Sequence, residues 1–414
     1  MPLGLYLSVP FCRTKCTYCN FASDVFSRAV FERYLDRVCA DLHSTPETAQ
    51  KMASRVEAEA NSVYLGGGTP TVLDSQQLER LFVTVRQNFR LLPETEITVE
   101  CAPGTLTPAV LETFLRCGVN RVSLGVQSFV DQEASAVGRL HQRGTVLDDV
   151  ARLRGAGIAN INLDLIAGLP HQTAESWQIS LAETVALGVP HVSVYMLEVD
   201  DDSRLGRELI AGGTRYHAHF VPDEELTASL YETACEQLNA AGIQQYEISN
   251  FALVGFESRH NLKYWTRQPY LGFGVDAHSM LVSVEDDREA VRFSTPDSLD
   301  QYVAEAPRSR TAVSRAGSLE ETFFLGLRLV SGLDLDEVGA QFGHSVVAAL
   351  SPLLEELGAS GLLDRVDDRI RLTARGRLVS NEVFERFLAC AQTETHVPAA
   401  GAARLSSSVP ETGV

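Results

Sequence analysis

The first half of the chain alternates between short runs of β-branched and apolar residues and longer segments with helical character. This alternation predicts βα units whose strands form a parallel sheet. Glycines that end helices follow several of the longer segments, as at Gly118, Gly157 and Gly188. The predicted strands are residues 5–9, 62–65, 96–100, 121–126, 160–166 and 191–197, and the predicted helices are residues 28–43, 75–90, 108–117, 145–156 and 174–187.

Six βα units are too few for a closed eight-stranded barrel, so the pattern favours an α/β fold with an open, partial (β/α)6 barrel over residues 1–250. A strand-like run at residues 244–248 could extend the sheet, and a doubly wound open sheet is the alternative. Most predicted strands end in polar or glycine-rich residues. Both architectures place their chemistry at the carboxyl ends of the strands. The strand ends therefore define the predicted site.

The pattern changes in the second half of the chain. Residues 251–318 are predicted to connect the barrel to a domain over residues 319–390, whose short amphipathic helices and small hairpin at 364–372 resemble a winged-helix module. This domain contains seven Arg, no Lys and twelve acidic residues, a net charge of 7 − 12 = −5, so DNA binding is not expected. We expect a lid or docking domain. Residues 391–414 are rich in Ala, Ser, Thr and Pro and are predicted to be disordered.

Composition narrows the functional classes. The 414 residues include 35 Lys and Arg against 54 Asp and Glu, a net charge of −19, which argues against nonspecific binding to nucleic acid. No basic start followed by an apolar segment is present, and no apolar run approaches the roughly 20 residues of a membrane span, so we expect a cytoplasmic protein. Three of the eight cysteines fall within residues 12–19, which favours metal binding in a reducing compartment over a disulfide framework.

Cys12, Cys16 and Cys19 have the spacing C-x3-C-x2-C directly after the first predicted strand. Three thiolates cannot saturate the four irons of a 4Fe-4S cluster, so one iron keeps an open position for another ligand. A structural zinc site is the alternative, and Cys39 or His43 could supply its fourth ligand. The cluster is favoured because structural zinc sites usually carry their ligands as two spaced pairs.

Glycines and polar residues occupy the ends of the following predicted strands. Residues 66–70, Gly-Gly-Gly-Thr-Pro, end the second strand, where glycines let a ligand approach the backbone closely. Carboxylates such as Glu100 and Asp164 can accept hydrogen bonds from ribose hydroxyls, and Arg139 can pair with a ligand carboxylate. Gln127 lies at the end of the fourth strand. Singly, each residue is more often a salt-bridge partner or a strand cap, but together they suit S-adenosylmethionine.

The same motifs resemble the radical-SAM proteins related to oxygen-independent coproporphyrinogen III oxidase. The resemblance extends over residues 3–390 and includes Gly-Val-Gln-Ser-Phe at 125–129 and Asp-Leu-Ile-Ala-Gly-Leu-Pro at 164–170. It implies a 4Fe-4S cluster on Cys12, Cys16 and Cys19, with S-adenosylmethionine on the open iron, where electron transfer cleaves the sulfonium to methionine and a 5'-deoxyadenosyl radical. The residues implied around S-adenosylmethionine are Tyr6, Tyr18, Gly67, Gly68, Thr69, Glu100, Gln127, Arg139 and Asp164.

Three features place the chain nearer to the HemW branch, regarded as haem chaperones, than to the true oxidases. In the true oxidases the cysteine motif has the form C-x3-C-x2-C-x-C. Phe21 stands at the position of the last, additional cysteine of that motif. The N-terminal arm of the oxidases has no room before Cys12. Residues 260–265 match the H-N-x-x-Y-W motif of the chaperone branch. The haem-contacting residues implied by this match are His260, Asn261, Tyr264 and Trp265.

The residue types in this motif suit haem. His260 could bind the iron or contact the macrocycle, Tyr264 and Trp265 offer flat apolar area, and Arg259 or Lys263 could pair with propionates. The alternative is an ordinary strand-loop with a histidine whose hydrogen bonds are satisfied and a tryptophan packed on the barrel.

The sequence therefore predicts a radical-SAM, 4Fe-4S haem chaperone that delivers haem to respiratory haemoproteins. Its expected partners are haem or porphyrin, haem-accepting respiratory proteins at the membrane, a reductant protein and a second copy in a homodimer, with transient membrane association. The first alternative is an oxygen-independent coproporphyrinogen III oxidase, which decarboxylates propionates, although that activity is not expected. The second alternative is a non-catalytic scaffold with a zinc loop.

Overall fold

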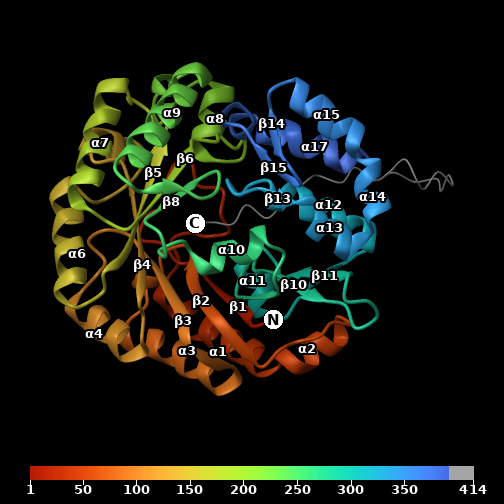
Figure 1. Ribbon diagram of the computed structural model, residues 1–414. Helices are drawn as coiled ribbons and strands as arrows, with labels where there is room; N and C mark the ends of the chain where they lie inside the picture. The colour runs from red at the N-terminus through yellow and green to blue at the C-terminus, as the bar shows by residue number, and fades with distance from the viewer. Residues whose placement is uncertain (391–414) are drawn as a thin grey trace.

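The computed structural model describes residues 1–390. Its main body is a twelve-stranded sheet in the order β12-β11-β10-β9-β1-β2-β3-β4-β5-β6-β8-β7. The sheet is strongly curved and helices cover its outer face, which gives an α/β architecture (Figure 1). Because β12 and β7 lie at the two ends of the strand order and do not pair, the sheet stays open. The predicted open, partial barrel is confirmed.

The six predicted strands are all present and pair in parallel, in sequence order. Gly118 and Gly188 end α4 and α7 in the left-handed conformation that glycine adopts without strain. The strands are β1 (Leu3–Val9), β2 (Glu59–Gly67), β3 (Arg90–Cys101), β4 (Arg121–Gln127), β5 (Asn160–Ala167) and β6 (His191–Met196). The helices of this region are α1 (Phe31–His43), α2 (Thr45–Lys51), α3 (Ser75–Asn88), α4 (Pro108–Cys117), α5 (Asp131–Ala136), α6 (Arg143–Gly155), α7 (Ala174–Leu187), α8 (Arg204–Ala211) and α9 (Glu224–Ala240).

The two faces of the sheet differ in polarity. Side chains alternate along a strand, so Leu5 and Leu7 of β1 enter the apolar core under the helices, whereas Tyr6 stacks on Tyr64 of β2 at a ring-centroid separation of 6.0 Å. Farther along the inner face, the Asn162 side chain donates to Ser193 Oγ at 3.0 Å. The inner face is therefore a buried polar layer.

Four strands from residues 251–318 extend the sheet beyond β1. They are β9 (Tyr270–Phe273), which runs parallel to β1, and the antiparallel β10 (His278–Val282), β11 (Ala290–Ser294) and β12 (Ser309–Val313). At the opposite edge, the run 244–248 does extend the sheet, as predicted, but only residues 244–245 form a strand. The chain then forms a tight hairpin of β7 (Gln244–Gln245) and β8 (Asn250–Ala252), because the Glu247 carboxylate accepts the Ser249 backbone N–H at 3.1 Å and reverses the chain.

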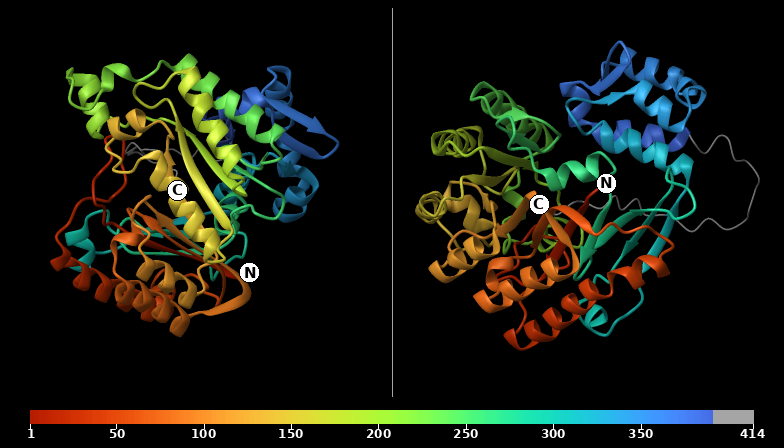
Figure 2. Two further views of the ribbon diagram at one scale, coloured as in Figure 1. Left: turned by 90° about the vertical axis from the view of Figure 1, so that its left-hand side faces the viewer. Right: turned by 60° about the horizontal axis from the view of Figure 1, so that its bottom comes forward.

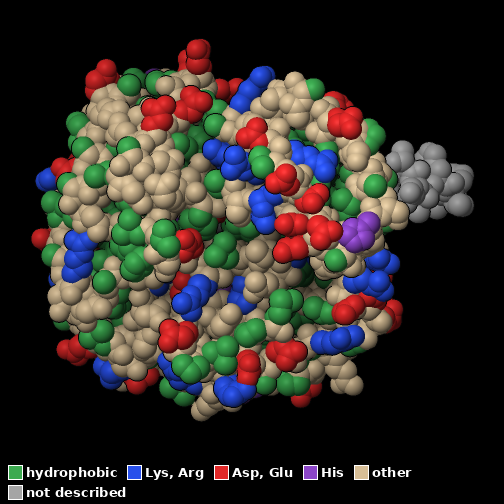
Figure 3. All heavy atoms as spheres, in the orientation of Figure 1, with side chains coloured by type: hydrophobic (Ala, Val, Ile, Leu, Met, Phe, Trp, Pro, Cys, Tyr) green, Lys and Arg blue, Asp and Glu red, His purple; other side chains and the backbone are tan. Residues whose placement is uncertain are grey.

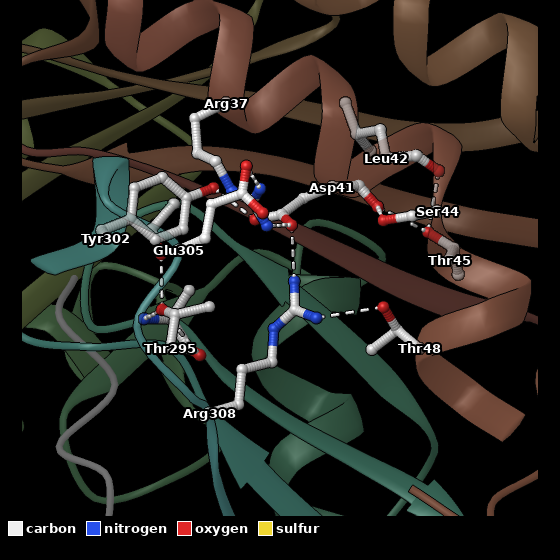
Figure 4. A network of polar contacts seen from close by, with 12 residues as sticks. Arg37, Asp41, Leu42, Ser44, Thr45, Thr48, Thr295, Tyr302, Glu305 and Arg308 are labelled. Atoms are coloured by element: carbon white, nitrogen blue, oxygen red, sulfur yellow. Dashed lines mark hydrogen bonds and ion pairs between the residues drawn. The ribbon is translucent and has the colours of Figure 1, made fainter. Parts of the chain in front are cut away.

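A buried carboxylate joins α1 to the added strands (Figure 4). Asp41 accepts a hydrogen bond from the Tyr302 hydroxyl of α11 (Leu299–Val303) at 2.6 Å. It also forms ion pairs with Arg308 at 2.7 Å and with Arg37, one turn away on α1, at 2.5 Å. Arg308 reaches Thr48 of α2 at 3.0 Å. This network fixes the 299–308 segment against the first two helices.

The C-terminal domain has its own apolar core. Phe323 stacks on Phe387 at a centroid separation of 5.0 Å, and Ile248 from the barrel side joins the same core. The expected hairpin at 364–372 is formed by β14 (Leu363–Val366) and β15 (Arg369–Leu372). The remaining elements are β13 (Leu333–Asp334), α12 (Arg315–Gly326), α13 (Leu335–Phe342), α14 (His344–Ala349), α15 (Ser351–Ala359), α16 (Ala374–Leu378) and α17 (Ser380–Cys390). The tail that was predicted to be disordered, 391–414, lies outside the described residues.

Ion pairs connect the C-terminal domain to the added strands. Glu321 of α12 accepts from Arg267 at 2.8 Å and from Arg292 of β11 at 2.7 Å. On the face shown in Figure 3, acidic and basic side chains are interspersed over both parts of the molecule. In the portion of the chain that the structure describes, every helix is too short or too polar to cross a bilayer.

We expect Asp41→Ala to lower the free energy of unfolding by about 3 to 5 kcal/mol, because it leaves two guanidinium groups without their buried partner. The measurement is denaturant unfolding of the full chain, followed by circular dichroism. Asp36→Ala is the matched control, since Asp36 pairs with Arg80 at the surface and its loss should cost less than about 1 kcal/mol. Equal losses in the two variants would contradict the role given to the buried network.

Candidate functional site

The cysteine loop leaves the carboxyl end of β1 and is closed by backbone hydrogen bonds. Cys12 N donates to Asp24 O, and Asp24 N donates to Pro10 O, both at 3.0 Å. Phe11 anchors the start of the loop by stacking on Phe31 of α1 at a centroid separation of 3.8 Å. Aromatic packing and backbone pairing together hold the three cysteines on one short, partly exposed loop.

The thiols of this loop lie close enough to affect one another. Burial raises the pKa of Cys12 and of Cys19, and the neighbouring Cys16 adds to both shifts. Cys16 Sγ accepts a hydrogen bond from Arg139 Nη1 at 3.5 Å. Three soft sulfur donors on one loop suit an iron–sulfur cluster, because metal binding displaces the thiol protons and compensates the thiolate charge. The donor set therefore fits the implied cofactor.

Neither residue suggested as the fourth ligand of a zinc site lies beside the cysteine loop. Cys39 is buried between α1 and α3, where its sulfur accepts from Thr84 Oγ1 at 3.4 Å. His43 pairs with Asn88 at 3.1 Å on the outer surface of the same helix pair. Both residues belong to the helical layer and not to the cysteine loop. Within residues 1–390, no group of three or more His, Cys, Asp or Glu side chains is arranged to hold a single metal ion.

The glycine motif at the end of β2 is attached to the cysteine loop. Gly68 N donates to Val9 O and Thr69 N donates to Phe11 O, both at 2.8 Å. A Cβ at Gly68 would lie 2.7 Å from Val9 O and 3.1 Å from Cys12 Sγ, so only glycine fits there. The motif consequently sets how closely β2 approaches the cysteines.

Glu100, at the end of β3, lies behind the glycine motif. Its carboxyl accepts from the Tyr64 hydroxyl at 2.9 Å and from Gly67 N at 3.2 Å. Burial, reinforced by the charge of Asp164, raises the pKa of Glu100 to about 8. A Cβ at Gly66 would lie 2.6 Å from Glu100 Oε1, so this glycine is needed to admit the carboxyl. The carboxyl is therefore fixed at the strand end by Tyr64 and Gly67.

Polar side chains at and beyond the ends of β4 and β5 complete the buried polar layer of the inner face. Asp164 accepts from Ser123 at 2.9 Å and from Asn162 at 2.6 Å, and burial raises the pKa of Asp164. Gln127 has a left-handed φ of 68°, and its buried Oε1 has no hydrogen-bond partner in residues 1–390. Arg139 donates to Gly125 O and to the cysteine loop, while its buried Nε has no partner in the same residues. These unpaired atoms suit a polar ligand.

The remaining predicted ligands lie in the same layer. Tyr6 stacks on Tyr64, and burial raises the pKa of Tyr6 well above its ordinary value. Tyr18 packs beside Ile166 and Leu169 and lies within electrostatic range of Cys16 and Arg139. The structure thus gathers every predicted cluster and S-adenosylmethionine residue at the carboxyl end of the sheet. Their roles as ligands stay predictions.

The predicted haem motif lies at the opposite end of the barrel. Residues 260–265 fall within a helix, α10 (Arg259–Trp265), and do not form the strand-loop of the alternative interpretation. A Cβ on Gly4 of β1 would lie 3.3 Å from His260 Cε1, so α10 closes the amino end of the sheet. From Gly4 to Val9, strand β1 spans roughly 17 Å at about 3.3 Å per residue. The motif and the cysteine loop are therefore separated by the depth of the barrel.

Both ring nitrogens of His260 have partners. Nδ1 pairs with Ser62 Oγ at 3.0 Å and Nε2 with the Tyr264 hydroxyl at 2.9 Å, and the side chain is 1% exposed. Burial, together with the Lys263 charge, lowers the pKa of His260 to about 3, so the imidazole is neutral. In this conformation the ring has no free nitrogen for iron.

The other motif residues are also engaged. Lys263 donates to Pro2 O at 2.8 Å, and Arg259 donates to Glu94 O at 2.5 Å, so both expected propionate partners bind backbone instead. Arg328 of the C-terminal domain lies 4.2 Å above the Trp265 ring. Asn261 Oδ1 and Trp265 Nε1 are buried without a partner in residues 1–390. The motif lies at the contact between the barrel and the C-terminal domain.

Comparison with known proteins gives the family. The chain matches the Radical SAM superfamily over residues 6–182 and the HemN C-terminal domain over residues 313–379. A protein named Heme chaperone HemW from Lactococcus lactis is 33% identical over 391 residues, which cover 94% of this chain and 97% of that relative. Its namesake from Bacillus subtilis is 32% identical over 387 residues, covering 92% and 98%. The chain belongs to the HemW family of radical-SAM proteins.

The HemW family shares its fold with an oxidase of known structure. Coproporphyrinogen III oxidase (HemN) from Escherichia coli, a radical-SAM enzyme, superposes with a TM-score of 0.77 at 25% identity, and the match covers 95% of this chain and 91% of that one. Membership in the radical-SAM superfamily implies a 4Fe-4S cluster and S-adenosylmethionine.

Sequence reasoning missed the side chains that support these groups. Tyr64 and Ser123 hold the Glu100 and Asp164 carboxyls. Arg121 is fully buried on the inner face, and none of its guanidinium nitrogens has a hydrogen-bond partner in residues 1–390. The alternation of polar and aliphatic residues along the predicted strands could have identified these inner-face side chains.

Gly68→Ala is expected to reduce the iron and sulfide content after anaerobic reconstitution by more than about half, because the new methyl group must displace Val9 or the cysteine loop. Metal and sulfide analysis provides the measurement. Gly144→Ala in α6 is the matched control, since a Cβ there meets nothing within 4 Å. Full cluster content in Gly68→Ala would show that the close approach is unimportant.

The raised pKa of Glu100 predicts that the free energy of unfolding of the ligand-free protein depends on pH. This pKa lies near 8 in the folded chain against an ordinary 4.5, so the folded state keeps a proton that the unfolded state releases. The stability contributed by this group is present below about pH 4.5 and is lost as the pH rises toward 8, by up to about 1.4 kcal/mol per pH unit. Glu100→Gln should remove this slope in urea unfolding measured from pH 5 to 8. Exposed Glu94→Gln should retain it, and equal slopes in wild type and Glu100→Gln would refute the assignment.

Proposed function

We propose that this protein is a haem chaperone that uses the radical-SAM fold to bind a 4Fe-4S cluster and S-adenosylmethionine, and that it delivers haem to respiratory haemoproteins. Full-length similarity to proteins named Heme chaperone HemW carries the proposal. We further propose cytoplasmic location with transient membrane contact, a protein reductant and a homodimeric state. These finer properties rest on the family resemblance.

The geometry of the site supports the proposed cofactor residues. Cys12, Cys16 and Cys19 would hold the cluster, which supplies one-electron reductive cleavage of S-adenosylmethionine when both are bound. Arg139 suits the ligand carboxylate, because its guanidinium reaches the cysteine loop and keeps Nε unpaired. Glu100 suits the ribose hydroxyls, since its carboxyl lies directly behind Gly67. The remaining proposed contacts are Tyr6, Tyr18, Gly68, Thr69, Gln127 and Asp164.

The oxidase function is the second candidate, because the HemN structure covers nearly the whole chain. Phe21 argues against it, because its apolar side chain stands where the oxidases are expected to carry an additional cysteine thiol. An anaerobic assay with coproporphyrinogen III, S-adenosylmethionine and a reductant separates the two functions. We expect no vinyl-bearing product, and catalytic formation of that product would overturn the chaperone proposal.

We also propose that the α10 motif contacts haem after α10 opens. His260 would first have to release Ser62 or Tyr264 to present a ring nitrogen, and Trp265 would have to leave Arg328. His260→Ala should therefore weaken equilibrium haem affinity by at least about tenfold, equivalent to about 1.4 kcal/mol. Anaerobic titration followed in the Soret band measures this change. Exposed Thr266→Ala at the end of the same helix is the control, and an affinity unchanged in His260→Ala would refute the motif's role.

A further inference from the structure

The segment between β6 and α9 borders the cluster end of the barrel. It contains α8 and the 3-10 helix η3 (Ala218–Phe220). Leu205 N donates to Thr17 O at 2.9 Å and Arg204 Nη1 to Lys15 O at 3.3 Å, so the segment packs on the cysteine loop. In the left view of Figure 2, this green segment and the red cysteine loop lie at one end of the sheet, and the blue C-terminal domain lies at the other.

Two histidines face each other at this end. His171 follows β5 and His217 precedes η3, and their Nε2 and Nδ1 atoms are 3.1 Å apart. Both backbones are left-handed, with φ values of 70° and 61°, a conformation that is uncommon for histidine and recurs at ligand-binding positions. His171 N donates to Phe220 O at 3.0 Å, which holds the pair together. This backbone hydrogen bond keeps the two histidine-bearing segments side by side.

The pairing leaves one ring nitrogen free for a ligand. His217 Nε2 has no hydrogen-bond partner in residues 1–390, and the half-buried ring borders a cavity of about 230 Å³ that Phe220 also lines. Iron-binding imidazoles are commonly oriented by a hydrogen bond at the second ring nitrogen, which His171 provides here. Burial and the neighbouring imidazoles lower the pKa of His171, which favours the neutral form that such a pair requires.

Three arginines of the same segment lack carboxylate partners. Arg204, Arg207 and Arg215 line a second cavity of about 600 Å³, which Glu208 also lines, and none of the three forms an ion pair with another described residue. The nearby Glu208 is already engaged, because its carboxylate accepts Tyr216 N at 2.8 Å and Ala218 N at 3.2 Å. On a chain of net charge −19, an uncompensated arginine group marks a site for an anionic ligand.

Apolar side chains are exposed beside these polar groups. Phe220 is 47% exposed, and Leu209 and Ile210 on α8 are 48% and 69% exposed. A histidine with a free ring nitrogen, guanidinium groups and exposed apolar surface therefore occur within one segment of about 17 residues (204–220). Haem combines the matching features, namely an iron with open axial positions, a flat apolar ring and two propionates.

We propose that the α8–η3 segment is a haem-docking site in which His217 binds the iron, His171 orients it, and Arg207 and Arg215 pair with the propionates. The inference rests on the proposed haem-binding function and names the site that is accessible in this conformation, in contrast to His260. In this view, haem reaches the segment at the barrel mouth before any opening of α10.

Rapid anaerobic mixing of haem with the reconstituted full-length chain tests the iron ligand. His217→Gly keeps a residue that accepts the left-handed backbone, and we expect it to abolish the first haem-bound Soret spectrum and to regain that spectrum when free imidazole is added. His344→Ala, an exposed histidine on α14, is the control and should match wild type. A first spectrum unchanged in His217→Gly would overturn the docking site while leaving the proposed function standing. Absence of haem binding by the wild-type chain would overturn both.

The propionate contacts are tested with Arg207→Ala/Arg215→Ala. This variant should bind haem at least about tenfold more weakly, yet bind haem dimethyl ester as wild type does, because the ester has no charge to pair. Arg365→Ala/Arg371→Ala on the C-terminal hairpin removes the same charge and should bind both ligands normally. Equal weakening for haem and its ester, or no weakening for either, would refute the contacts.

Discussion

The buried polar layer on the inner face of β1 to β6 is the constraint on which the rest of the structure depends. Polar groups taken out of water are costly unless they find partners, so many of the inner side chains hydrogen-bond to one another. Asn162 illustrates this, since its amide donates to Ser123, Asp164 and Ser193 from three neighbouring strands. This network also holds Asp164, and Tyr64 of the same layer holds Glu100 at the end of β3. Support of the fold and preparation of the site are therefore one set of interactions.

The network also explains the position of α10. Its first backbone N–H groups donate to the buried Glu96 carboxylate at 3.1 Å. His260 Nδ1 forms a hydrogen bond with the Ser62 hydroxyl at the base of β2. A helix that supplies these partners closes the amino end of an open sheet, which would otherwise expose its polar interior. The haem motif consequently has a structural role in this conformation. Any contact between His260 and haem must be coupled to the opening of this end.

The two ends of the barrel have different accessibility. At the carboxyl end, the cysteine loop is partly exposed and is bordered by α8 and η3, whose histidine and arginine groups retain unsatisfied bonding capacity. At the amino end, Arg328 covers Trp265 and Glu321 bridges Arg267 and Arg292. A ligand that enters at the first end and later contacts the second would require the C-terminal domain to move.

Local signals in the sequence determined the six βα units, the cysteine loop and the strand-end residues, because alternation, glycine stops and short motifs depend only on neighbouring residues. The C-x3-C-x2-C spacing and Phe21 likewise needed no tertiary information. Tertiary structure decided what depends on distant pairing. It converted 244–248 into a hairpin, added β9 to β12 to the sheet, and placed the 260–265 motif as a helix far from the cysteines. It also brought His171 to His217 across 46 residues, a contact that local pattern cannot reveal because it arises only when β5 and η3 pack together.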